Sequence, residues 1–128
     1  MPITVQAIFA ATEEVVLQSG ADRVSILDVC NVAGISRGTF YRYFSAQDDL
    51  LDALAAECFR RFARSQSEAV AGVADVPGQL KASGLGYIAF AMTNPSWFRL
   101  MFQRITVAAQ APDEHADLLL ASTEAMAV

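Results

Sequence analysis

The chain has 128 residues, and 54% of them are hydrophobic, which is enough apolar surface for one or two small folded units. Its formal net charge of −5 argues against a general nucleic-acid binder, because attraction to phosphate needs a basic surface. Runs of alternating β-branched residues are absent, so we expect an all-α fold.

A first helix is predicted from about Thr4 to Ser19, and Gly20 is placed to end it. The residues expected to face inward recur at helical spacing and are Val5, Ile8, Phe9, Thr12, Val15 and Val16. We expect this side to pack across the two helices that follow and to close a three-helix core.

Residues 25–44 are predicted to form two short helices joined by a tight turn. Ser25 is a suitable N-cap for the first helix, and Ser36 for the second. Gly34 stands where the first helix must end, since glycine enters the left-handed backbone region without a Cβ clash. Two helices held at a fixed angle are typical of proteins that place the second helix in the major groove of DNA.

The second helix, predicted over residues 37–44, exposes a polar face and turns Phe40 and Phe44 inward. The exposed residues are Arg37, Thr39, Tyr41, Arg42 and Tyr43. Arg37 and Thr39 lie in the first turn, where an arginine can donate two hydrogen bonds to guanine and a threonine offers a hydroxyl or a methyl group. The other three suit phosphate oxygens. On spacing alone, a helical hairpin with a solvated polar face explains the pattern equally well.

The run AGISRGTFYRYFSAQDDLL, residues 33–51, resembles the helix-turn-helix signature of TetR-family transcriptional regulators, and the likeness extends back to about residue 5. The resemblance implies a DNA-binding domain over residues 1–46 that contacts a double-stranded DNA operator. The residues it implies as DNA contacts are Ser25, Ser36, Arg37, Thr39, Tyr41, Arg42, Tyr43 and Gln47, with Arg37 as a specificity position. It also implies a homodimer that regulates transcription, more often by repression than by activation.

Two departures from the family pattern lower the expected affinity for DNA. Gln47 stands where the family usually has a lysine that contacts phosphate, and residues 1–4 carry no basic arm. Residues 1–47 also hold three arginines against four carboxylates. Missing cations weaken the electrostatic attraction that supplies most non-specific affinity. A protein-interaction module with the same fold that has lost strong DNA binding therefore stays open as an alternative.

A long helix is predicted from about Ala46 to Val70, with Ser45 as its N-cap. Its broad inward face is expected to consist of Leu50, Leu51, Leu54, Ala55, Cys58, Phe59, Phe62 and Ser65. Arg60, Arg61 and Arg64 cluster on the same helix, either as a solvated face or as a second phosphate site.

Residues 71–78 form a predicted break, and a further helix is expected from about residue 78 to residue 92. Gly84 and Gly86 lie inside this helix, where glycine costs roughly 1 kcal/mol relative to alanine. We therefore expect both glycines to mark the close approach of another helix.

Asn94 and Pro95 predict the start of the next helix, with asparagine as N-cap and proline in the first turn. A loop is expected over residues 110–112 and a last helix over residues 113–126. His115 has no companion at metal-ligand spacing and is expected on the surface.

The run YIAFAMTNPSWFRLMF, residues 87–102, resembles the C-terminal ligand-binding domain of one TetR subgroup. The resemblance implies that residues 47–128 form a helical ligand-binding and dimerisation domain with an apolar cavity for an unidentified small-molecule effector. The implied pocket residues are Phe62, Tyr87, Phe90, Trp97, Phe98, Met101 and Phe102. The same aromatic stripe also fits a plain core. We expect this domain to be truncated, or to be atypical and paired through its last two helices.

The sequence shows no nucleophile beside a base, no paired carboxylates and no phosphate loop, so we expect no catalytic, metal or cofactor site. The longest nearly apolar run, residues 84–92, is too short to span a bilayer, and the first residues lack a signal-peptide pattern. Cys30 and Cys58 suit a reducing compartment as small core residues. We therefore expect a cytoplasmic TetR-like transcriptional regulator, a repressor released by a small apolar effector.

Overall fold

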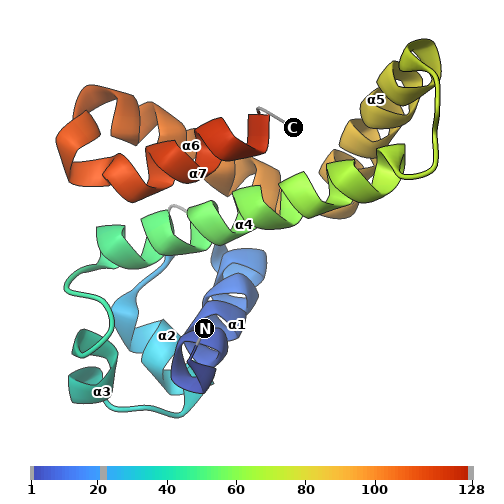
Figure 1. Ribbon diagram of the computed structural model, residues 1–128. Helices are drawn as coiled ribbons and strands as arrows, with labels where there is room; N and C mark the ends of the chain where they lie inside the picture. The colour runs from blue at the N-terminus through green and yellow to red at the C-terminus, as the bar shows by residue number, and fades with distance from the viewer. Residues whose placement is uncertain (1, 21–22, 127–128) are drawn as a thin grey trace. The chain divides into compact units, whose positions relative to one another are not determined.

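The computed structural model describes residues 2–20 and 23–126, and within these ranges every regular element is helical, which confirms the expected all-α fold (Figure 1). The elements in chain order are α1 (Ile3–Ser19), α2 (Ile26–Ala33), α3 (Arg37–Tyr41), α4 (Gln47–Val70), α5 (Val76–Thr93), α6 (Pro95–Gln110), the 3₁₀ helix η2 (Pro112–His115) and α7 (Ala116–Met126). The chain divides into two compact units, residues 1–54 and 55–128. None of the described helices combines the length and low polarity that crossing a membrane requires.

The first unit is built around α1, α2 and α3, with α1 packed on α2 and α2 on α3. The inward side of α1 is buried from Ile8 to Val16 as predicted, and only Val5 is half-buried. Phe40 and Phe44 are buried, and the ring of Phe44 lies 5.8 Å from that of Phe40 and 6.0 Å from that of Phe9 on α1. Aromatic packing therefore joins the first and third helices of this unit.

The third helix is shorter than predicted, because α3 ends at Tyr41 rather than at Phe44. Beyond Tyr41, the amides of Arg42 and Tyr43 donate to carbonyls three residues back, at 3.2 and 3.0 Å. Such bonds tighten the last turn of a helix. The tightened turn leaves Phe44 directed into the core of the first unit.

The predicted long helix is present as α4, which begins at Gln47. Ser45 lies before the N-cap position, and its hydroxyl donates a hydrogen bond to the carboxylate of Asp49. The apolar positions of the predicted inward face are all buried from Leu50 to Phe62, which includes Cys58.

In the second unit, α5 begins two residues earlier than predicted, because Asp75 accepts a hydrogen bond from the amide of Gly78 at 2.8 Å and caps the helix. The two interior glycines differ. A Cβ built at Gly86 would lie 2.9 Å from the Cβ of Ala69 on α4, so the close approach predicted there is confirmed. A Cβ built at Gly84 meets nothing within 4 Å, so the same prediction is wrong at that position.

The predicted start of α6 at Pro95 is confirmed, although Asn94 does not cap the helix with its side chain. The Asn94 amide nitrogen instead donates to the carbonyl of Phe90 at 3.2 Å. After α6, the segment predicted as the start of the last helix forms η2, which contacts α6 and α7. His115, expected on the surface, is buried at the end of η2 because η2 folds back onto these two helices.

Candidate functional site

The turn between α2 and α3 has the geometry that the sequence predicts. Gly34 adopts φ 71° and ψ 34°, and its amide donates to the carbonyl of Cys30 at 2.9 Å. Ser25 caps α2 by accepting a hydrogen bond from the amide three residues on at 3.1 Å, and Ser36 caps α3 in the same way at 3.1 Å. Helix ends satisfied on both sides hold α3 at a set angle to α2.

Arg37, the first residue of α3, has an exposed side chain. It forms no ion pair with another residue in the described part of the chain. Its guanidinium donors are therefore available to an external acceptor. The planar fork of these donors matches the two acceptors on the major-groove edge of guanine and also matches a phosphate group.

The hydroxyls of Ser36 and Thr39 form a short chain. Ser36 Oγ accepts from the Thr39 amide and donates to Thr39 Oγ1, both at 3.1 Å. Ser36 is thus occupied in holding the first turn of α3, whereas Thr39 keeps its own hydroxyl proton for an outside acceptor. The two hydrogen bonds with Ser36 therefore hold the Thr39 side chain in one orientation.

The remaining predicted DNA contacts flank α3. Tyr41, Arg42 and Tyr43 are exposed, and Ser25 and Gln47 are half-buried at the first turns of α2 and α4. All five residues belong to the first unit. Their hydroxyl, guanidinium and amide groups can all donate hydrogen bonds to phosphate oxygens.

The charge of the first unit is unfavourable for DNA. Residues 1–54 contain three arginines and seven carboxylates. A basic footprint is the usual electrostatic feature of a DNA-binding unit. Here the positive charge on the predicted contact set comes from Arg37 and Arg42 alone.

The predicted pocket residues lie in the second unit, and six of them form one aromatic cluster. These six are Phe62 on α4, Tyr87 and Phe90 on α5, and Trp97, Phe98 and Phe102 on α6. The ring of Phe62 lies 5.3–6.1 Å from three of the others, at interplanar angles of 70–87°. Met101, the seventh predicted residue, is buried on α6. Edge-to-face contacts at these distances are those of packed rings.

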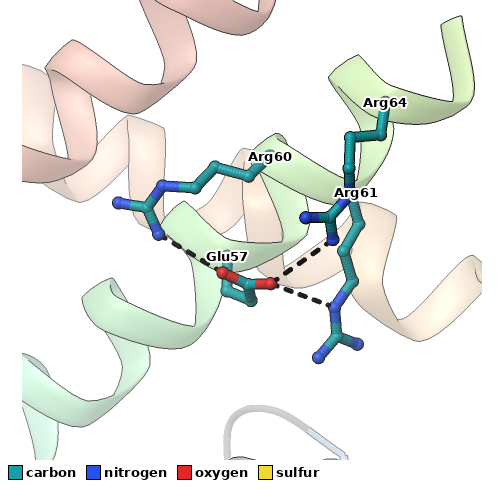
Figure 2. Close-up of polar contacts among 4 residues, drawn as sticks. All are labelled: Glu57, Arg60, Arg61 and Arg64. Atoms are coloured by element: carbon teal, nitrogen blue, oxygen red, sulfur yellow. Dashed lines mark hydrogen bonds and ion pairs between the residues drawn. The ribbon is translucent and has the colours of Figure 1, made fainter. Parts of the chain in front are cut away.

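Glu57 on α4 is the common partner of three arginines on the same helix (Figure 2). Its carboxylate oxygens lie 3.4, 3.5 and 3.6 Å from guanidinium nitrogens of Arg60, Arg61 and Arg64. The Glu57 side chain is only 13% exposed, whereas Arg60 and Arg64 project into solvent. One carboxylate against three cations leaves two positive charges on this face of the helix.

The sequence analysis identified the three arginines but not Glu57, the carboxylate that pairs with all of them. The spacing of Glu57 to the arginines, at i+3, i+4 and i+7, places all four on one helical face and was the available signal. It also missed the contact of Arg61 with Trp97, where the guanidinium carbon lies 4.6 Å from the ring centroid. In the described ranges no group of three metal-ligating side chains converges.

The sequence profile of the tetR family of bacterial regulatory proteins matches residues 8–54. YvdT, an uncharacterized HTH-type transcriptional regulator of Bacillus subtilis (strain 168), is 42% identical over 50 residues, which are 39% of this chain and 26% of that protein. An uncharacterized HTH-type transcriptional regulator of Haemophilus influenzae is 33% identical over 57 residues, which are 44% of this chain and 30% of that protein. The match thus spans less than a third of the length of either relative.

Solved structures show the same fold over a longer stretch. A protein of unknown function from Rhodococcus sp. RHA1 aligns with 98% of this chain and 63% of its own, with a TM-score of 0.80 at 23% identity. A TetR-family transcriptional regulator from Haemophilus influenzae RD aligns with 79% of this chain and 56% of its own, with a TM-score of 0.63 at 24% identity. The profile match and the capped α2–α3 turn show that residues 8–54 form the helix-turn-helix region of the tetR family of bacterial regulatory proteins, and the solved structures show that the fold continues beyond it.

Proposed function

We propose that the chain is a DNA-binding transcriptional regulator that inserts α3 into the major groove of an operator. The observation that carries the proposal is the capped α2–α3 turn with an exposed Arg37 at the start of α3. In a helix-turn-helix, the first residues of the second helix contact base edges. Two copies together would place two such helices on half-sites about 34–36 Å apart.

Each predicted contact has a role in this proposal. Arg37 and Thr39 contact base edges, and Ser36 holds Thr39 in position. The residues that contact phosphate are Ser25, Tyr41, Arg42, Tyr43 and Gln47. Because few cations are present, affinity rests on a small number of phosphate contacts, and we expect it to be modest and to fall as salt rises.

A gel shift with the DNA upstream of the chain's own gene tests the proposal. The titration is run at about 50 mM and about 200 mM salt, with a scrambled duplex of the same composition as the control. A complex on the upstream DNA at both salts, and a weaker one on the scrambled duplex, supports sequence-specific binding. Equal binding to both duplexes, or none at the lower salt, contradicts it.

We further infer that the regulator is a repressor released by a small apolar or aromatic effector that binds at the aromatic cluster of the second unit. The support is chemical: six rings from three helices meet there, and such linings suit apolar ligands. An effector that separates α4, α5 and α6 in this cluster favours one conformation over another.

Trp97 allows a direct test of this effector site, because it is the only tryptophan of the chain and its ring contacts both Arg61 and Phe90. Toluene serves as the apolar probe and glycerol as the polar control. A saturable change in tryptophan emission with toluene, and none with glycerol, supports binding in the cluster. A change that rises linearly with toluene and does not saturate indicates a solvent effect only.

A second candidate function is a protein-interaction module that has lost strong DNA binding. The observation that favours it is the excess of carboxylates in residues 1–54, together with the neutral Gln47 at the start of α4. This candidate predicts no shift of any duplex at the lower salt. The same gel shift therefore separates the two candidates.

A further inference from the structure

The contact between α4 and α5 is lined mainly by apolar side chains, with one hydrogen-bonded polar pair among them. The residues of α5 that face α4 recur at i, i+3, i+4 and i+7 and are Ser83, Gly86, Tyr87 and Phe90. The residues of α4 that face them are Phe62, Gln66 and Ala69. Nε2 of Gln66 donates to Oγ of Ser83 at 3.0 Å. Because burying polar groups costs free energy, this pair needs a physical reason.

The other end of the Gln66 carboxamide has no donor. Its Oε1 atom is buried and accepts no hydrogen bond within the described residues. The atom lies beside Gly86, where an added Cβ would come within 2.9 Å of it, so the missing side chain at Gly86 is what leaves room for it. Buried carbonyl oxygens nearly always have a hydrogen-bond partner, since one without a partner destabilises the fold.

A purely structural role explains only half of this amide group. A buried polar pair can fix how two helices align, and the bond from Gln66 to Ser83 is sufficient for that. Oε1 takes no part in it. A buried water molecule would need about two to four polar partners, whereas Gly86 and Ala69 beside this oxygen offer no polar side chain. The oxygen is therefore suited to a donor carried by a mainly apolar molecule.

The Gln66 oxygen lies one helical turn from the aromatic cluster. Gln66 follows Phe62 by four residues on α4. Ser83 precedes Tyr87 by four residues on α5, so the two pairs form neighbouring layers of the same contact. One turn is about 5.4 Å, of which an O–H···O hydrogen bond covers about 2.7–2.8 Å and the ring radius and C–O bond cover the rest. A ring that takes a place in the cluster can therefore present a hydroxyl to this oxygen.

We propose that the effector site at the aromatic cluster takes an aromatic molecule that carries a hydrogen-bond donor, a phenolic hydroxyl or a ring N–H, and that Gln66 Oε1 accepts this bond. The inference rests on the effector site proposed above and adds its specificity-determining residue. Ser83 holds the carboxamide so that its oxygen is offered to the ligand. A site with such an acceptor favours a ring with a donor over a ring of the same shape without one.

Three ring compounds of similar size test the inference, with Trp97 emission as the readout and excitation where the probes do not absorb. Toluene has no polar atom, anisole has an acceptor only, and phenol has a donor. Because water solvates phenol better than toluene, the quantity compared between proteins is the ratio of two dissociation constants. Gln66→Met keeps the length of the side chain and removes both polar atoms. It should weaken phenol relative to toluene by about 3–10-fold and change anisole relative to toluene by less than about twofold.

The matched control is Gln79→Met, the same change at an exposed residue of α5 whose carboxamide donates to the carbonyl of Val73. It should change neither ratio by more than about twofold. Circular dichroism establishes that the variants are folded. If Gln66→Met does not fold, Ser83→Ala takes its place, because it removes the hydroxyl that holds the Gln66 carboxamide and should lower the preference for phenol in the same direction.

The outcomes separate this inference from the effector site itself. Saturable toluene binding with an unchanged phenol-to-toluene ratio in the variant overturns the role of Gln66 and leaves the effector site standing. Equal losses for phenol and anisole indicate a packing role and also overturn it. No saturable signal with any of the three probes overturns the effector site and the inference together.

Discussion

Gly84 and Gly86 lie two residues apart on α5, and substitution by alanine at the two positions should have different effects on stability. Alanine in a helix interior is favoured over glycine by about 1 kcal/mol, because glycine loses more backbone freedom on folding. At Gly84 the added methyl group meets no atom within 4 Å. Gly84→Ala should therefore raise the free energy of unfolding by up to about 1 kcal/mol.

At Gly86 the same gain is opposed by overpacking. The added Cβ would lie 2.9 Å from the Cβ of Ala69 and 2.9 Å from Oε1 of Gln66. The Gln66 side chain can rotate away at the loss of its hydrogen bond to Ser83, but the Ala69 methyl is fixed to the α4 backbone. Overpacking of this kind costs about 1–3 kcal/mol. Gly86→Ala should therefore be neutral to about 2 kcal/mol destabilising, and the two variants should differ by about 1–3 kcal/mol.

Urea unfolding followed by circular dichroism measures this difference, with the unmodified chain as the reference. For a unit of the size of residues 55–128, which contains both glycines, each kcal/mol of stability also shifts Tm by about 4–8 °C. The measurement is made at two protein concentrations, because any self-association adds concentration-dependent stability. If Gly86→Ala stabilises the chain as much as Gly84→Ala does, the close approach of α4 and α5 is refuted.

Three further predictions concern the first unit. Arg37→Ala should weaken binding to a cognate operator by about 1–3 kcal/mol and relax the preference at one base position, as measured on a set of single-base operator variants; equal losses on random DNA would leave only a charge effect. Gln47→Lys should tighten binding to any duplex and steepen the log–log salt dependence by about 0.9, and an unchanged slope would show that residue 47 does not face phosphate. Ser36→Ala removes the cap of α3 and should lower the free energy of unfolding by about 1 kcal/mol in a urea titration, whereas Ser45→Ala, which removes no cap, should have a smaller effect.

Local features of this fold follow from the sequence because they depend on residues within one turn of each other. The caps at Ser25 and Ser36 and the left-handed Gly34 are of this kind, and all three are present. Asp75 caps α5 in the same way, so the start of α5 at Val76 could also have been predicted from the sequence. Helix ends and turns are therefore the part of this chain that a single sequence specifies best.

Features that depend on which helix lies opposite could not be predicted. Gly84 and Gly86 are the same residue type in the same helix, and only the position of α4 makes one crowded and the other open. A lone histidine in a polar segment is expected on the surface, yet His115 is buried where η2 contacts α6 and α7. The pairing of Arg61 with Trp97 likewise joins residues 36 positions apart in sequence. No local pattern encodes such contacts.

The aromatic cluster shows the same limit for the candidate site. Spacing along α6 places Trp97, Phe98 and Phe102 on related faces, but the partners Phe62 and Tyr87 come from two other helices. Only the resemblance to a ligand-binding domain predicted that these residues belong to one site. Their packing against one another as rings is a tertiary feature.

A single substitution at Glu57 would change the surface charge of α4 strongly. Glu57 is only 13% exposed, but Arg60 and Arg64 lie in solvent, and ion pairs with such exposed partners contribute little to stability, so replacing Glu57 with glutamine of the same size costs the fold little. The same single step removes the carboxylate shared by Arg60, Arg61 and Arg64 and changes the local charge from two positive units to three. This single substitution makes the helix face strongly cationic without the addition of an arginine. The identity of residue 57 therefore sets how positive this face of α4 is.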